Sequence, residues 1–190
     1  MTQAQASLLI LSQRYLDGLL DTSISLLEIH KLMFFLQEAG EPLQLNYKKG
    51  IYGPYAENLR HVLKRIEGHF IRGYEDGGDN PTKQLELIPE AVIKASKLTD
   101  QNPEIYTKLN KVFKLIDGFE SSFGLELLTT VYWAINKGGA DNPDKLENYI
   151  YAWNKRKKQF TPAQITLAHQ RLIEQNWITL KTHRANLQLN

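Results

Sequence analysis

Residues 25 to 39 read SLLEIHKLMFFLQEA, and this stretch is apolar around most of its circumference when it is wound as a helix. Two faces carry large apolar side chains, namely Leu26, Ile29, Met33 and Leu36 on one and Leu32 and Phe35 on the other. A helix that is apolar on most sides needs neighbours on most sides. The stretch therefore predicts a central helix around which the rest of the chain packs.

Helical periodicity continues on both sides of this stretch. Residues 4 to 20 predict a first helix, and five more follow residue 88. Proline or a capping residue begins each of these later helices, at Pro89, Pro103, Ser121 or Ser122, Pro143 and Pro162. The clearest start is Thr161-Pro-Ala-Gln164, which has the pattern of a capping box.

The segment from residue 43 to residue 87 predicts a small antiparallel sheet. Alternating side chains at 43–47 favour one strand, and 69–74 and 85–87 favour two more. Gly53-Pro54 has the pattern of a helix start, and the turn-rich residues 74–81 predict an exposed loop. The predicted fold class is mainly α with a small antiparallel β-sheet (α+β), in a single globular helical domain over residues 1–190.

Composition excludes several classes of protein. The 190 residues carry 23 Lys and Arg against 21 Asp and Glu, and this net charge of +2 disfavours nucleic-acid binding through a cationic coat. The absence of cysteine excludes disulfides and thiolate metal sites. No apolar run has the roughly 20 residues that span a bilayer, and the N-terminus lacks the features of a signal peptide. We expect no membrane association and a cytoplasmic location.

Residues 47 to 60, YKKGIYGPYAENLR, contain two glycines three positions apart before a predicted helix. The amino end of a helix attracts anions, which raises the question of a phosphate site. A P-loop requires more glycines and a Lys-Ser/Thr pair, and here two tyrosines stand where phosphate would approach. The stretch therefore favours a tight turn whose tyrosines pack on neighbouring helices.

No arrangement of residues in the sequence indicates catalysis, a cofactor or a metal site. The five histidines lack metal-ligand spacing, and His30 in its apolar helix is interpreted as a core histidine with satisfied hydrogen bonds. A Gly-x-Ser-x-Gly elbow is absent. The cationic run at 155–158 follows a predicted helix, where it complements the helix dipole. We expect no catalytic residue, no cofactor and no metal.

An exposed interaction surface is the remaining prediction. Aromatic and arginine side chains are favoured at interfaces, and acidic side chains gather in the turn-rich loop. The predicted partner-binding residues are Tyr52, Tyr55, Arg60, Lys64, Tyr74, Glu75, Asp76 and Asp79.

Three stretches resemble a known family. Residues 31 to 81, KLMFFLQEAGEPLQLNYKKGIYGPYAENLRHVLKRIEGHFIRGYEDGGDNP, resemble the C-terminal toxin-binding domain of DarG-type antitoxins from bacterial toxin–antitoxin systems. DGFESSFGLELLTTVYWA at 117–134 and the TPAQI…RLIEQNWI ending resemble the same domain. A looser similarity links the chain to Panacea-type antitoxin domains.

The resemblance implies a function by protein–protein contact. The partner would be a cognate DarT-like toxin, an NAD-using transferase that ADP-ribosylates thymidine in single-stranded DNA. The domain would inhibit this toxin by covering its DNA groove, with Glu75, Asp76 and Asp79 imitating DNA phosphates. The antitoxins also carry a hydrolytic macrodomain, and this sequence has no segment that resembles it. In the full-length protein the domain is expected to be fused to such a macrodomain. For this sequence the resemblance therefore implies no enzyme.

A second hypothesis is a DNA-binding transcriptional autoregulator of a toxin–antitoxin operon. Antitoxins often control their own promoters, and the cationic patches are the sequence feature that favours this reading. The toxin-facing surface, the affinity and the oligomeric state stay open.

Overall fold

A computed structural model of the chain describes residues 1–75 and 78–179. The chain divides into two compact units, unit 1 from Met1 to Thr130 and unit 2 from Val131 onward. The boundary lies inside helix α6 (Ser122–Asn136). Each unit has apolar side chains of its own that it buries, and the two are described separately below.

Helix α2 (Leu26–Glu38) is the centre of unit 1, as its sequence predicts. Every residue from Leu26 to Leu36 except Glu28 is buried. The helix begins with a capping box, in which the backbone N–H of Glu28 donates to Ser25 Oγ (3.2 Å) and that of Ser25 donates to the Glu28 carboxylate (2.9 Å). The same carboxylate accepts from Tyr15 and Ser122, so the start of α2 is joined to α1 (Gln3–Leu19) and α6.

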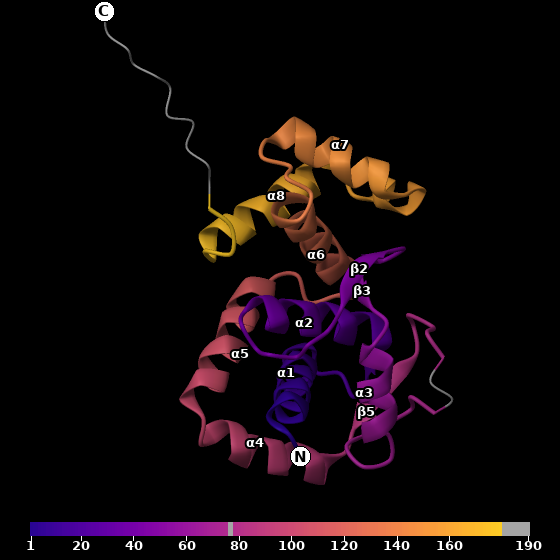
Figure 1. Cartoon of the computed structure of the whole chain (residues 1–190), viewed down its shortest axis with the longest axis vertical. Helices are drawn as coiled ribbons and strands as arrows, with labels where there is room; N and C mark the ends of the chain where they lie inside the picture. Colours follow the sequence, from indigo (N-terminus) through magenta and orange to yellow (C-terminus); the bar gives the residue numbers. More distant parts are fainter. Residues whose placement is uncertain (76–77, 180–190) are drawn as a thin grey trace, which may run out of the picture. The chain divides into compact units, whose positions relative to one another are not determined.

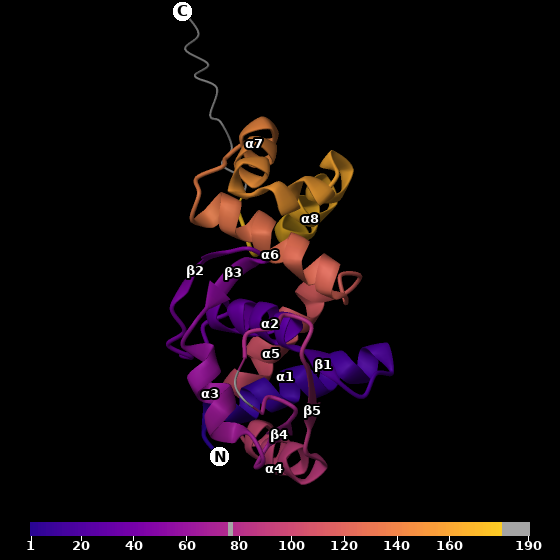
Figure 2. The same cartoon turned by 90° about the vertical axis from the view of Figure 1, so that its right-hand side faces the viewer.

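Helices surround α2 in unit 1. Figure 1 and Figure 2 show α1 and α5 (Pro103–Ile116) beside it, with α4 (Pro89–Asp100) packed against both of these helices. A buried carboxylate also joins these elements, because Glu41 accepts from Gln3 (3.0 Å) and lies 3.3 Å from the Lys108 ammonium. Since a buried charge is stable only when it is paired, this contact fixes the loop after α2 against α1 and α5.

Two small antiparallel sheets complete unit 1. The first has the order β1-β5-β4, from Ile24–Ser25, Gln84–Leu87 and Ile71–Arg72. The second is the hairpin of β2 (Tyr47–Gly50) and β3 (Gly53–Ala56). The strand predicted at 43–47 therefore begins four residues later, at Tyr47, and the helix start predicted at Gly53-Pro54 is wrong. Gly53 has φ +96°, which suits the hairpin turn, and helix α3 begins at Leu59 (Leu59–Ile66).

Unit 2 continues from α6 into α7 (Pro143–Trp153), the 3₁₀ helix η1 (Lys155–Gln159) and α8 (Pro162–Glu174). The predicted capping box at Thr161 is present. The cationic run differs from expectation, since Lys157 is fully buried with its Nζ 5.4 Å from the ring centres of Trp153 and Phe160. After α8, Trp177 packs edge-on against Tyr132 with ring centres 5.9 Å apart.

The predicted fold class, mainly helical with small antiparallel sheets, is confirmed. The prediction of one domain over 1–190 stays a prediction beside the two compact units. Within the described ranges, no helix is both long and apolar enough to cross a membrane.

Gly73 offers a test of the packing between β4 and β5. Its φ is +96°, and a Cβ there would lie 2.5 Å from the carbonyl oxygen of Gln84. Gly68 also has a positive φ (+74°) but has open space around it. We expect Gly68→Ala to lower the free energy of unfolding by about 1 kcal/mol, and Gly73→Ala by about 3 kcal/mol, because the clash adds to the backbone strain. Urea unfolding measures both, and equal losses would contradict this account.

Candidate functional site

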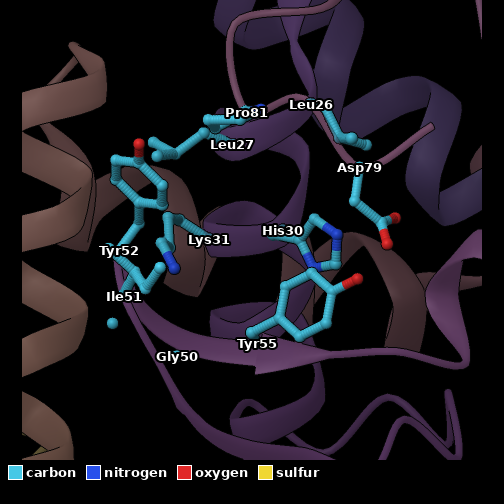
Figure 3. A pocket seen from close by; sticks show the side chains of 11 residues that line it. Leu26, Leu27, His30, Lys31, Gly50, Ile51, Tyr52, Tyr55, Asp79 and Pro81 are labelled. Atoms are coloured by element: carbon cyan, nitrogen blue, oxygen red, sulfur yellow. The ribbon is translucent and has the colours of Figure 1, made fainter.

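A pocket of about 220 Å³ lies in unit 1 between the start of α2, the β2–β3 hairpin and the segment that ends at Pro81. Figure 3 shows its side chains: Tyr52 and Ile51 on one side, His30 and Tyr55 facing them, and Leu26, Leu27 and Pro81 along the border. The pocket is mostly apolar, with a few polar groups that converge on it, which is the composition of small-molecule sites.

The hairpin tip forms one wall because glycines allow it to turn tightly and to lie close to its neighbours. Gly50 pairs with Gly53 across the turn, which leaves Ile51 and Tyr52 at the tip. A Cβ on Gly53 would approach Thr130 Oγ1 to 3.1 Å, so a larger residue would push the hairpin away from α6. The glycine pattern at 50–53 is therefore a tight turn, as predicted.

His30 is the central polar group of the opposite wall. Its ring stacks on Tyr55 with ring centres 4.6 Å apart and an angle of 24° between the planes. The side chain is 4% exposed, and its Nδ1 has no hydrogen-bond partner among the described residues. Burial, assisted by the nearby Lys31 charge, lowers the pKa of His30 to about 3, so the imidazole is neutral at physiological pH. The prediction of a core histidine is correct, and the prediction of satisfied hydrogen bonds is wrong.

Lys31 connects the two walls. Its side chain is buried, and Nζ donates a 2.7 Å hydrogen bond to the backbone carbonyl of Pro54 in β3. Hydrogen bonds from charged donors are stronger than neutral ones, particularly where water is excluded. The contact therefore holds the hairpin at a fixed distance from α2 and keeps the pocket open between them.

Asp79 borders the pocket and links Tyr55 to Arg60 through polar contacts. Burial and the Asp79 carboxylate, to which the phenol is hydrogen-bonded, raise the pKa of Tyr55 to about 12, so Tyr55 is protonated at physiological pH. The same carboxylate lies 3.9 Å from Arg60, which also contacts Glu57 at 3.7 Å. These contacts are largely exposed and contribute little to stability, but they orient Asp79 toward Tyr55.

The structure brings half of the predicted partner-binding residues together. Tyr52, Tyr55 and Asp79 line the pocket, and Arg60 reaches it through Asp79. The exposed side chains of Lys64 and Glu75 do not line it.

Two other predicted residues have a different outcome. Tyr74 is fully buried beneath Lys83, whose Nζ lies 5.5 Å from the centre of the tyrosine ring, so it lacks the exposure expected of a partner contact. Asp76 lies outside the described residues. The partner-binding role of the set as a whole stays a prediction.

Sequence reasoning missed His30, Lys31 and the apolar border of the pocket. One signal was present: His30-Lys31 interrupts a helix in which nearly all other central residues are apolar. Polar side chains retained on such a helix indicate buried groups with a specific partner or ligand. In the described ranges, no group of three or more acidic or histidine side chains is placed to hold a metal ion.

Comparison with known proteins identifies relatives with an enzyme name. Over 174 residues, 92% of the chain, the sequence is 38% identical to a Thermus aquaticus protein named DNA ADP-ribosyl glycohydrolase. Over 79% of the chain it is 32% identical to proteins with the same name from Mycobacterium bovis and Mycobacterium tuberculosis. The chain covers 47% and 44% of these proteins, so it spans about half the length of the curated relatives it matches. No family model matches the chain.

These names contradict four linked predictions. The relatives are named for an enzyme that acts on DNA, and not as toxin-binding antitoxin domains, inhibitors that imitate DNA, or operon regulators. The expectation of no enzyme is corrected with them. It rested on missing catalytic motifs, but a sequence that spans half of its relatives need not contain the motifs of the whole enzyme.

The buried imidazole makes stability depend on pH. The pKa of His30 is about 3 in the folded chain and near 6.5 when unfolded, so between these values the unfolded chain binds the extra proton. Stability is therefore retained above pH 6.5 and falls as the pH drops toward 3. From pH 7 to pH 5 the expected loss from this residue is about 2 kcal/mol. In His30→Gln that loss disappears, which urea unfolding at the two pH values measures.

The matched control is His61→Gln, which removes an exposed histidine of α3. This variant is expected to retain the wild-type pH dependence. If His30→Gln and the wild type lose equal stability between pH 7 and pH 5, the neutral buried imidazole is refuted.

Proposed function

We propose that the chain forms part of a DNA ADP-ribosyl glycohydrolase and acts in the removal of ADP-ribose from DNA. The observation that carries the proposal is the 38% identity over 92% of the chain to a protein of that name. The match runs through both units, including the segments that build the pocket.

Within that activity, the pocket supports substrate binding. Apolar walls with exposed aromatic edges suit the planar groups of nucleotides, which stack on tyrosine and histidine. Hydrolysis of a glycosidic bond generally uses two carboxylic acids on either side of the bond. Among the described residues that line the pocket, Asp79 is the one carboxylate. The role proposed for this chain is therefore to hold ADP-ribosylated DNA.

Charge supports recognition of the modification over recognition of the DNA backbone. With a net charge of +2, the chain offers little general attraction for phosphates. A preference for modified DNA then has to come from contacts with the ADP-ribosyl group or with the base that carries it. The toxin partner and the fused macrodomain expected from the sequence stay predictions.

Binding to a DNA oligonucleotide with and without one ADP-ribosyl group tests the proposal. We expect the chain to bind the modified strand at least tenfold more tightly, as measured by fluorescence anisotropy. Repeating the titration at two salt concentrations separates this preference from backbone attraction, because backbone binding weakens steeply with salt while the preference should persist. Equal affinity for the two strands would refute the binding role.

The same incubation reports on chemistry. Products resolved by electrophoresis show whether the chain alone releases ADP-ribose. Under the proposed role the chain alone binds the modified strand and releases no ADP-ribose. Release of ADP-ribose is expected only when a longer relative is added. Release by the chain alone would replace the binding role with a catalytic one.

A further inference from the structure

The volume of the unit 1 pocket limits what it can hold. At about 220 Å³ it is smaller than the 300–1,000 Å³ typical of sites for whole small-molecule ligands. It is still several times the roughly 30 Å³ that one water molecule occupies in the liquid. The pocket therefore has room for one planar ring system, and a complete ADP-ribosyl group would extend beyond it.

His30 places a polar ring among the apolar side chains that line the pocket. Buried polar side-chain atoms nearly always have a hydrogen-bond partner, so His30 Nδ1 is an exception that needs an explanation. The neutral imidazole offers one N–H donor and one nitrogen acceptor. A ligand with donors and acceptors along its edge can pair with the imidazole in either form, whereas a hydrocarbon cannot.

The other walls indicate a flat and uncharged ligand. Figure 3 shows the Tyr52 ring on one side of the pocket and His30 and Tyr55 on the other, with the Lys31 side chain between them and Leu27 and Pro81 above. Aromatic rings placed in this way accept a further ring by stacking or by edge contact. An anion is disfavoured because Lys31 Nζ already donates to Pro54 and Asp79 adds a negative charge at the border. A cation is disfavoured by the apolar walls.

We propose that this pocket binds a single nucleobase, placed between Tyr52 and the His30–Tyr55 pair, with a base edge hydrogen-bonded to His30. Nucleobases combine a planar ring with donors and acceptors on its edge. The inference rests on the proposed function, since both the adenine of an ADP-ribosyl group and a base of the DNA strand are sources of this chemistry.

Titrations with small probes test the pocket directly. The probes are ADP-ribose, an unmodified single-stranded oligonucleotide, and ribose 5-phosphate as a ligand without a base, with binding followed by calorimetry. We expect a base-containing probe to bind and ribose 5-phosphate not to bind. Binding of ADP-ribose identifies adenine as the occupant, and binding of the oligonucleotide alone identifies a DNA base. If neither base-containing probe binds, the inference is overturned.

Variants tie the binding to the pocket. Tyr52→Ala changes a half-buried side chain at the hairpin tip, and His30→Leu removes the polar contact with the base edge. Each variant is expected to bind the probe at least tenfold more weakly. Leu167→Ala, an exposed apolar residue of unit 2, is the matched control and should bind as the wild type does. Circular dichroism confirms that each variant is folded. Unchanged affinity in a folded Tyr52→Ala variant overturns the inference.

The two proposals fail in different ways. A preference for ADP-ribosylated DNA that survives Tyr52→Ala would leave the proposed function standing and remove the pocket from it. Binding of free ADP-ribose that depends on Tyr52, without a preference for modified DNA, would support the pocket and refute the proposed function.

Discussion

The hydrogen bond from Lys31 Nζ to the Pro54 carbonyl is the contact on which the architecture around the pocket depends. A lysine in the middle of a helix that is buried on nearly every side is costly unless acceptors reach it. The β2–β3 hairpin supplies one, and in doing so it must cross the start of α2 at close range. The small size of Gly53 allows that approach. The position of the hairpin is therefore determined by the hydrogen bond that the buried Lys31 ammonium makes to it.

The pocket follows from the same arrangement. Because the hairpin is held to α2 at Lys31, its tip extends past the first turns of the helix and leaves a space beside His30. Tyr55 covers one face of the imidazole, and Asp79 comes from a distant part of the sequence to meet the tyrosine hydroxyl. Side chains from α2, from the hairpin and from the segment around Asp79 meet here, and within the described ranges the Nδ1 atom of His30 has no hydrogen-bond partner.

The sequence predicted what is decided locally. The capping box at Thr161 and the helix starts at Pro89, Pro103, Pro143 and Pro162 were predicted correctly because a few neighbouring residues determine them. The hairpin was misread at Gly53-Pro54, where the same two residues suit a helix start or a turn, and only pairing with Lys49 across the turn decides. The site required long-range information, since His30 and Asp79 are brought together by tertiary packing. The prediction of no enzyme was wrong because it rested on the absence of catalytic motifs. A sequence that spans about half the length of its relatives need not contain those motifs.

Each compact unit contains a buried lysine whose chemical labelling can report when that unit opens. Lys31 is 2% exposed in unit 1 and Lys157 is 0% exposed in unit 2, whereas the Lys48 side chain is 66% exposed. An amine-reactive reagent must reach the nitrogen from water, so it modifies Lys48 in the folded chain and spares the other two. Labelling at Lys31 then reports the opening of unit 1, and labelling at Lys157 reports the opening of unit 2. Mass spectrometry of the labelled peptides would follow the unfolding of the two units separately in one sample.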